Sequence, residues 1–226
     1  MHSPVRIALF GGTFDPVHIG HLGAARAAAR LLRLDKVLFV PSAFPPHKLR
    51  HRLTSYEHRF GMVTLACAGE GGFVPSLLES PSSDGQPQYS VSTAGRVKRR
   101  LAPADRLFFL LGADAFLDLP HWKAHDRLLE MVDFIVVSRP GFSIRDIRGV
   151  IPKGLLRPLK SPKEMKSFRL RQTDLHVIED MHVLVAARDI RKMAAAGLSL
   201  AGLVPPLVEE YIRKEGLYRP ARPGIA

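Results

Sequence analysis

Two histidines three residues apart, His18 and His21, lie in the stretch G-G-T-F-D-P-V-H-I-G-H-L, residues 11–22, directly after a short apolar segment. Glycines let a backbone turn sharply and approach a ligand without a Cβ in the way. The dipeptide Asp15-Pro16 favours a turn that starts a helix, and histidines at i and i+3 lie on one side of its first turn. Because a helix N-terminus binds anions, we expect a phosphate pocket supplied with two imidazoles.

The same stretch lacks the patterns of other phosphate and metal sites. It contains neither the G-x-x-x-x-G-K-[ST] of a P-loop nor the G-x-G-x-x-G of a dinucleotide site. A zinc site needs three or four ligands, yet no H-E-x-x-H pattern or cysteine pair accompanies the two histidines. The residues therefore favour binding and alignment of phosphates.

Apolar segments of β type alternate with amphipathic helical patterns along the chain. We expect strands at Val5–Phe10, Lys36–Val40, Arg106–Leu111, Asp133–Val137 and Leu175–Ile178. Helices are expected at Ile19–Arg33, Ser55–Ala68, Val91–Leu101, His125–Met131, Arg188–Ala196 and Pro206–Glu215. This order predicts an α/β fold, with a doubly wound, mostly parallel, Rossmann-like sheet and C-terminal helices in one domain over residues 1–226.

Composition narrows the class of protein. The chain has 226 residues, of which 46% are hydrophobic, and no apolar run reaches the length of a membrane span. Its single cysteine, Cys67, cannot form an internal disulfide and fits a reducing compartment. We therefore expect a cytoplasmic protein that has no membrane partner.

The formal net charge of +12 suggests anionic partners such as nucleic acid or phosphorylated small molecules. Residues 139–171 hold ten Lys and Arg against two acidic residues, a local charge of +8. Because Phe142 and Phe168 make no regular aromatic interleaving, we interpret this segment as a solvated, mobile insertion and not as a nucleic-acid site. The tail, residues 219–226, is expected to be disordered.

The first motif, G-G-T-F-D-P-V-H-I-G-H, resembles the signature of the nucleotidyltransferase superfamily with the T/H-x-G-H histidine motif. Later stretches are similar, in the same order, to the nicotinate-nucleotide adenylyltransferase family. They are P-S-A-F-P-P-H-K (41–48), T-S-Y-E-H-R (54–59), Q-Y-S-V-S-T (88–93), F-F-L-L-G-A-D-A-F-L-D-L-P-H-W-K (108–123), D-F-I-V-V-S-R-P-G (133–141) and a closing L-V-P-P-L-V-E-E-Y-I-R-K-E-G-L-Y. The resemblance implies an enzyme that joins ATP and nicotinate mononucleotide, gives deamido-NAD and pyrophosphate, and depends on Mg²⁺.

The resemblance also implies which residues hold ATP. The catalytic group would comprise His18, His21, Lys48 and Arg191, with His21 at the transferring phosphate. Backbone contacts to the nucleotides would come from Gly11, Gly12, Thr13 and Phe14, and contacts to the adenosine from Gly112 and Asp114. A plain alternative for Asp114 is a helix N-cap.

For the second substrate the resemblance implies a phosphate end and a pyridine end. His47 and Lys48 would lie over the phosphates, although both could equally be solvated loop charges. Trp122 would stack on the pyridine ring, or else serve only as an apolar anchor. Backbone groups of Tyr89 and Ser90 would frame the nicotinate carboxylate.

One departure from the family is marked. Where the family has I-S-S-T-x-I-R, this chain has V-A-A-R-D-I-R, residues 185–191, so the hydroxyls that would cap a helix and bind phosphate are absent. We expect Arg188, on one helix face with Arg191, to replace them in part. Two smaller departures are Ser90, where Thr is usual, and Ser92, where Asp is expected.

Two alternative functions therefore stay open. One is a catalytically weakened nucleotide- or RNA-binding protein on the same fold. The other is a different adenylyltransferase such as phosphopantetheine adenylyltransferase. The sequence gives no indication of an oligomeric state.

Overall fold

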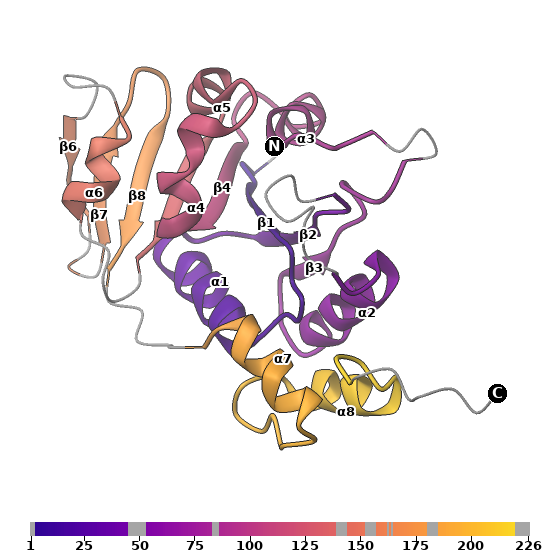
Figure 1. The fold of residues 1–226 in the computed structure, drawn as a ribbon. Coiled ribbons are helices and arrows are strands. Elements are labelled where there is room, and N and C mark those ends of the chain that lie inside the picture. Colours follow the sequence, from indigo (N-terminus) through magenta and orange to yellow (C-terminus); the bar gives the residue numbers. More distant parts are fainter. Residues whose placement is uncertain are drawn as a thin grey trace.

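The computed structural model describes residues 3–44, 53–82, 86–138, 144–151, 157–161, 163, 165–179 and 185–219. At its centre lies one sheet with the strand order β3-β2-β1-β4-β5-β8-β7-β6 (Figure 1). The pairs from β3 through to β8 are parallel, whereas β7 runs antiparallel to both β8 and β6. The strands are β1 (Arg6–Gly12), β2 (Lys36–Pro41), β3 (Phe73–Pro75), β4 (Arg106–Gly112), β5 (Asp133–Val137), β6 (Arg157–Leu159), β7 (Met165–Arg169) and β8 (Asp174–Ile178).

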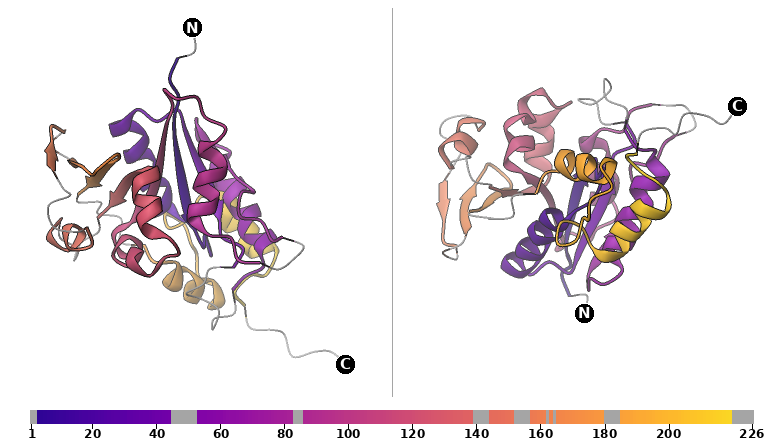
Figure 2. Two further views of the ribbon diagram at one scale, coloured as in Figure 1. Left: turned by 90° about the horizontal axis from the view of Figure 1, so that it is seen from above. Right: turned by 60° about the horizontal axis from the view of Figure 1, so that its bottom comes forward.

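Helices cover both faces of this sheet, as the view from above in Figure 2 shows. One apolar cluster takes residues from α1 (Ile19–Leu32), α2 (Tyr56–Cys67), α7 (Ala187–Ala195) and α8 (Pro206–Lys214). The other takes residues from α3 (Ser90–Lys98), α4 (Ala113–Leu117), α5 (His125–Met131) and α6 (Ile144–Gly149). The predicted doubly wound, mostly parallel sheet with C-terminal helices is confirmed. Within the described ranges, every helix is too short or too polar to span a membrane.

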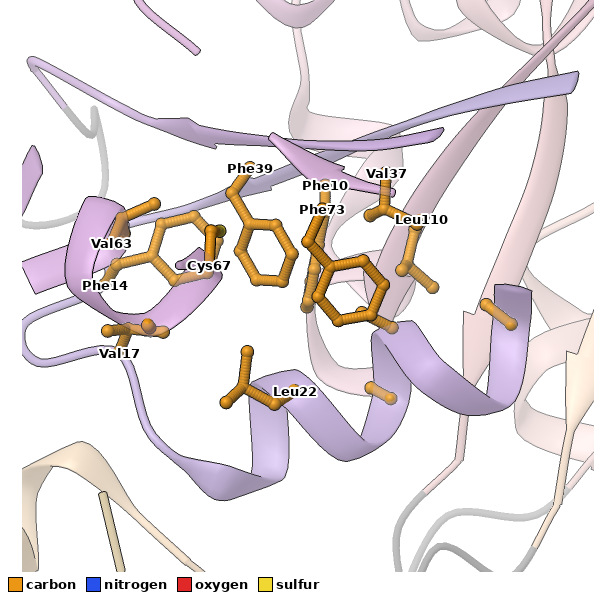
Figure 3. Packing of buried hydrophobic residues seen from close by; sticks show 14 of the residues in the cluster. Phe10, Phe14, Val17, Leu22, Val37, Phe39, Val63, Cys67, Phe73 and Leu110 are labelled. Carbon is orange, nitrogen blue, oxygen red and sulfur yellow. The ribbon is translucent and has the colours of Figure 1, made fainter. Parts of the chain in front are cut away.

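The loop after β1 is fastened to the first cluster by its own side chains. The buried rings of Phe10, Phe14, Phe39 and Phe73 gather between the sheet and helices α1 and α2 (Figure 3). Phe14 lies edge-on to Phe10 at 5.5 Å between ring centroids. Because burial of an aromatic side chain contributes strongly to stability, this packing ties the loop that follows β1 to the core.

The basic segment differs from its prediction. We expected a solvated insertion over residues 139–171, but β7 belongs to the sheet, and Met165, Phe168 and Ile147 are buried. Lys166 and Arg169 of the same strand are exposed. The net charge of a window does not reveal this division, because it counts the basic residues and takes no account of the apolar residues between them.

Several short elements were also missed in the sequence. They are β3, β6, β7, α4 and α6, each of which has seven residues or fewer. Elements this short span too few residues to show a periodic pattern, and the equally short β5 and β8 were predicted from their apolar, β-type residues. Residues 220–226 lie outside the described ranges, so the disordered tail stays a prediction, as does the single domain.

Candidate active site

The carboxyl ends of β1 and β4 meet where the strand order reverses. From β1 the chain continues outward to β2 on one side, and β4 then pairs with β1 on the other. Ligands of open α/β sheets bind at such a switch point. The register pairs Phe10 with Leu110, which brings Gly12 and Gly112, the last residues of the two strands, to the same edge of the sheet.

The two glycines of the first motif are needed for different reasons. A Cβ placed on Gly12 would lie 2.9 Å from the ring of Phe14, which is buried and cannot retreat. A Cβ on Gly11 would meet Phe109 at 3.6 Å, an ordinary contact. Only Gly12 is therefore required by the packing of the protein itself, and Phe14 completes the turn with a positive φ of 50°.

The two histidines form a stacked pair at the start of α1. The helix begins at Ile19 as predicted, so His18 is its N-cap residue and His21 lies in its first turn. The two rings lie 3.7 Å apart between centroids, with 29° between their planes. The backbone N–H of His18 donates to Nδ1 of His21 at 3.2 Å. Because Nδ1 accepts, neutral His21 carries its proton on Nε2, the nitrogen that can donate to a phosphate oxygen.

Buried Arg59 fixes the loops around this pair. Its guanidinium donates to the carbonyls of Thr13 and Ser42 at 2.8 Å, of Thr54 at 3.0 Å and of Ala43 at 3.4 Å. Burial lowers the pKa of Arg59. One side chain thus joins the loop after β1 to both described ends of the loop between β2 and α2.

The structure brings only one of the two predicted arginines to the first motif. Nη1 of Arg191 donates to the carbonyl of Asp15 at 2.7 Å. The side chain of Arg188 is 75% exposed, and its Nε lies 3.6 Å from Oδ1 of Asp189. At the N-cap, Ala186 offers no side-chain hydrogen bond to the helix, as the missing hydroxyl predicts.

The predicted pyridine end is made by α3 and the segment after α4. Tyr89 caps α3, Ser90 is its first residue, and Lys123 places its Nζ 4.1 Å from the centre of the Tyr89 ring. Trp122 is half-buried and lies edge-on to Phe109 at 6.0 Å. The neighbours Trp122 and Lys123 therefore bring this segment to the start of α3.

The remaining predicted residues are placed as follows. Asp114 is exposed in the first turn of α4, and Gly112 is the N-cap, so the helix-cap alternative for Asp114 is wrong. His47 and Lys48 lie outside the described residues.

Sequence reasoning missed two buried charges beside the site, Arg59 and Glu79. Glu79 accepts from Oγ1 of Thr93 at 3.0 Å, and its carbonyl accepts the Ala43 N–H at 3.1 Å. Burial raises the pKa of Glu79. A signal for Arg59 was present, because it takes the position one turn before Met62 on the apolar face of α2.

Comparison with known proteins agrees with this arrangement. A family model described as cytidylyltransferase-like matches residues 9–173. A probable nicotinate-nucleotide adenylyltransferase of Moorella thermoacetica is 37% identical over 222 residues, which cover 98% of this chain and 95% of that protein. One from Thermus thermophilus is 40% identical over 215 residues, covering 95% of this chain and all of the relative.

A solved structure shares the fold. It is the Plasmodium falciparum nicotinic acid mononucleotide adenylyltransferase complexed with NaAD, with a TM-score of 0.70 and 19% identity over 95% of this chain and 97% of that one. At this identity the likeness shows the fold alone. The sequence relatives, matched over nearly their whole length, establish that the chain belongs to the nicotinate-nucleotide adenylyltransferase family.

Proposed function

We propose that the protein transfers the adenylyl group of ATP to nicotinate mononucleotide, yielding deamido-NAD and pyrophosphate in NAD biosynthesis. The observation that carries this proposal is the stacked pair His18 and His21 at the N-terminus of α1, at the switch point between β1 and β4. Membership of the family supports the same reaction, because its relatives carry the name of that activity.

The reaction asks the protein for alignment and charge stabilisation. The phosphate monoester of the mononucleotide is mostly ionised near neutral pH, since its second pKa is about 6. One of its oxygens forms a bond to the α-phosphorus of ATP, while the bond from that phosphorus to the bridging oxygen breaks. Pyrophosphate is the leaving group. Because the attacking phosphate is already ionised, no proton has to be removed from it. Catalysis then depends on bringing two polyanions together in line and on stabilising the developing charge.

On the ATP side, His21 would donate from Nε2 to the transferring phosphate. Backbone amides at Gly11, Gly12, Thr13 and Phe14 and at the start of α1 would bind phosphate oxygens. Arg191, fixed on the Asp15 carbonyl, would add a positive charge.

The other ATP contacts complete the proposed set. Gly112 and Asp114 would hold the adenosine, the carboxylate of Asp114 accepting from ribose hydroxyls. Arg188 would approach the phosphates from α7. His47 and Lys48 would cover the phosphates from the loop between β2 and α2.

On the pyridine side, Trp122 would stack on the ring of the nicotinate. Backbone N–H groups of Tyr89 and Ser90 would bind its carboxylate. Lys123 adds a cation over the Tyr89 ring, so the local charge favours the acid over the neutral amide.

Mg²⁺ is part of the proposal because it enters with ATP. At such sites the ion is held chiefly by substrate phosphates and water, not by a protein cage. Histidines and arginine are poor ligands for it, and in the described ranges no group of three His, Cys, Asp or Glu could hold a metal ion. The residues present fit an ion carried by the nucleotide, where it would neutralise the charge of the leaving pyrophosphate.

We also propose a cytoplasmic location. It is consistent with the buried thiol of Cys67, because burial raises the pKa of that thiol to about 12.

The test is an assay of the purified protein with Mg-ATP and either nicotinate or nicotinamide mononucleotide. We expect a dinucleotide and pyrophosphate in equal amounts, a preference for the acid substrate, and loss of turnover when a chelator removes Mg²⁺. Phosphopantetheine serves as a third acceptor. No product with either mononucleotide would refute the proposal, and a preference for the amide would refute only the acid specificity.

A further inference from the structure

Asp15 is a buried carboxylate three residues before His18. Only 4% of its surface is exposed. Its Oδ1 accepts the hydroxyl of Tyr218 at 2.8 Å, and its Oδ2 accepts the backbone N–H of Thr54 at 3.3 Å. A buried carboxylate needs such donors, since an ionised group out of water without them is costly. The most remote of them, Tyr218, is 203 residues away in the chain.

The backbone of Asp15 is held as well. Its carbonyl accepts Nη1 of Arg191 at 2.7 Å. Nearby, the first N–H of α1, that of Ile19, donates to the carbonyl of Leu203 at 3.0 Å. The loop that carries the histidine pair is therefore bonded to α7, to the α7–α8 connection and to the segment after α8. Figure 1 shows α7 beside the start of α1 and α8 beside α2.

The turn that ends α8 directs Tyr218 toward Asp15. Gly216 has a φ of 62°, its N–H donates to Arg213, and the N–H of Leu217 donates to Ile212. These are the bonds of a Schellman motif, which ends a helix with a residue in the left-handed conformation. Tyr218 also has a positive φ, of 67°. The chain thus reverses after α8 and places the Tyr218 ring against the first cluster, with its hydroxyl at Asp15.

The loop needs support of this kind. Phe14 has a φ of 50°, and a non-glycine residue in that region is kept there by its surroundings. Burial, together with Asp15, raises the pKa of Tyr218. The hydroxyl therefore keeps its proton, and remains the donor, over the whole pH range of an ordinary assay.

We propose that Tyr218 is a positioning residue for ATP: through Asp15 it holds the loop before His18 in the conformation that receives the nucleotide phosphates. It need not touch a substrate itself. The inference rests on the proposed function and adds a role for the segment after α8, to which the reaction by itself assigns none.

The experiment compares two variants that each lose one hydroxyl. Tyr218→Phe removes the donor to Asp15. Tyr211→Phe is the matched control, because its hydroxyl lies 2.9 Å from Nδ1 of His58 and joins α8 to α2 without reaching the loop. Calorimetry with Mg-ATP measures binding without turnover, steady-state kinetics give KM for each substrate, and thermal melting reports the fold.

We expect Tyr218→Phe to weaken ATP binding roughly five- to twentyfold, because a buried carboxylate loses a hydrogen bond. KM for nicotinate mononucleotide should be unchanged, and Tyr211→Phe should bind ATP as the unaltered protein does. Equal ATP binding in the two variants would overturn the inference. The inference would also be overturned if Tyr218→Phe lost ATP affinity only in proportion to a fall in its melting temperature that is larger than the fall for Tyr211→Phe. If the unaltered protein binds ATP but forms no dinucleotide, the proposed function fails while this comparison of binding remains valid.

Discussion

The phosphate end and the pyridine end of the proposed site are built differently. The loop before His18 is held by donors from distant parts of the chain, namely Arg59, Arg191 and Tyr218. The segment of Trp122 is held by near neighbours, as in the bond from its N–H to Leu119. One end is fixed by tertiary contacts, and the other by local turns and ring packing.

The start of the loop between β2 and α2 lies between two buried ionisable side chains, Arg59 at the phosphate end and Glu79 at the pyridine end. The Arg59 guanidinium donates hydrogen bonds to four carbonyl oxygens, and the Glu79 carboxyl group accepts one from Oγ1 of Thr93. The two meet at Ala43, whose carbonyl faces Arg59 and whose N–H donates to the carbonyl of Glu79. The start of the loop between β2 and α2 is therefore hydrogen-bonded on both sides, to Arg59 and to the backbone of Glu79.

This difference indicates which substitutions should change kcat and which should change the affinity for a substrate. Stabilising charge in a transition state requires donors that are already fixed, as they are at the phosphate end. Stacking on a ring requires only an accessible face, such as that of half-buried Trp122. We expect loss of a donor to the transferring phosphate to lower kcat, and loss of a contact that only binds or positions a substrate, at either end, to raise KM for that substrate.

The largest effect should follow from His21→Ala. Removing a donor from the transferring phosphate should lower kcat by roughly two to four orders of magnitude with little change in melting temperature. Replacing exposed His121 by alanine is the matched control and should leave kcat unchanged. If His21→Ala keeps full kcat, the histidine is only a helix cap and the proposed division of the site fails.

Next in size is Trp122→Ala at the pyridine end. Stacking of a base on an aromatic ring is worth about 1–3 kcal/mol, so KM for nicotinate mononucleotide should rise roughly ten- to a hundredfold. KM for ATP should stay the same, and Trp122→Phe should restore most of the affinity. A fall in kcat without a change in either KM would contradict the comparison.

A smaller effect is expected where the chain departs from its family at the start of α7. The triple variant Ala186→Ser, Ala187→Ser and Arg188→Thr restores the family hydroxyls and should lower KM for ATP by roughly tenfold, since a hydrogen bond to a charged group is worth about 1.5–3 kcal/mol. Arg188→Ala alone should raise it about twofold. If Arg188→Ala leaves KM unchanged while the triple variant lowers it, Arg188 does not replace the hydroxyls.

The smallest effect concerns stability at the pyridine end. Burial raises the pKa of Glu79, so the folded protein disfavours its charged form. The stability linked to its proton is fully present below the pKa of the unfolded chain and is lost as pH rises through the folded value. Glu79→Gln should therefore be more stable than the unaltered protein at pH 8, on the order of 1 kcal/mol or less, and the difference should vanish near pH 4. Denaturant unfolding at both pH values measures this, and a difference that does not depend on pH would contradict it.

Much of the fold and part of the site were predictable. The long strands and helices follow from hydrophobic period, and the first motif gave the glycine pair and both histidines in one place. The start of α1 at Ile19 was predicted, but the stacking of the His18 and His21 rings was not, because spacing along the chain does not fix the orientation of two side chains. Strand β7 was not predicted, because its buried apolar residues Met165 and Phe168 lie in a segment rich in basic residues.

The amino-acid sequence alone predicted the alternation of strands and helices, a phosphate pocket at the end of β1 and the resemblance to the family, because each prediction rests on periods or short motifs of residues close together along the chain. How the loop before His18 is held depends on tertiary contacts. Arg59 lies on the buried face of α2, and its four carbonyl acceptors all lie outside that helix. The hydroxyl of Tyr218 donates to Asp15, which is 203 residues away in the chain. Hydrogen bonds over such separations leave no periodic trace in a sequence, since their partners are brought together only when the sheet and both apolar clusters have formed.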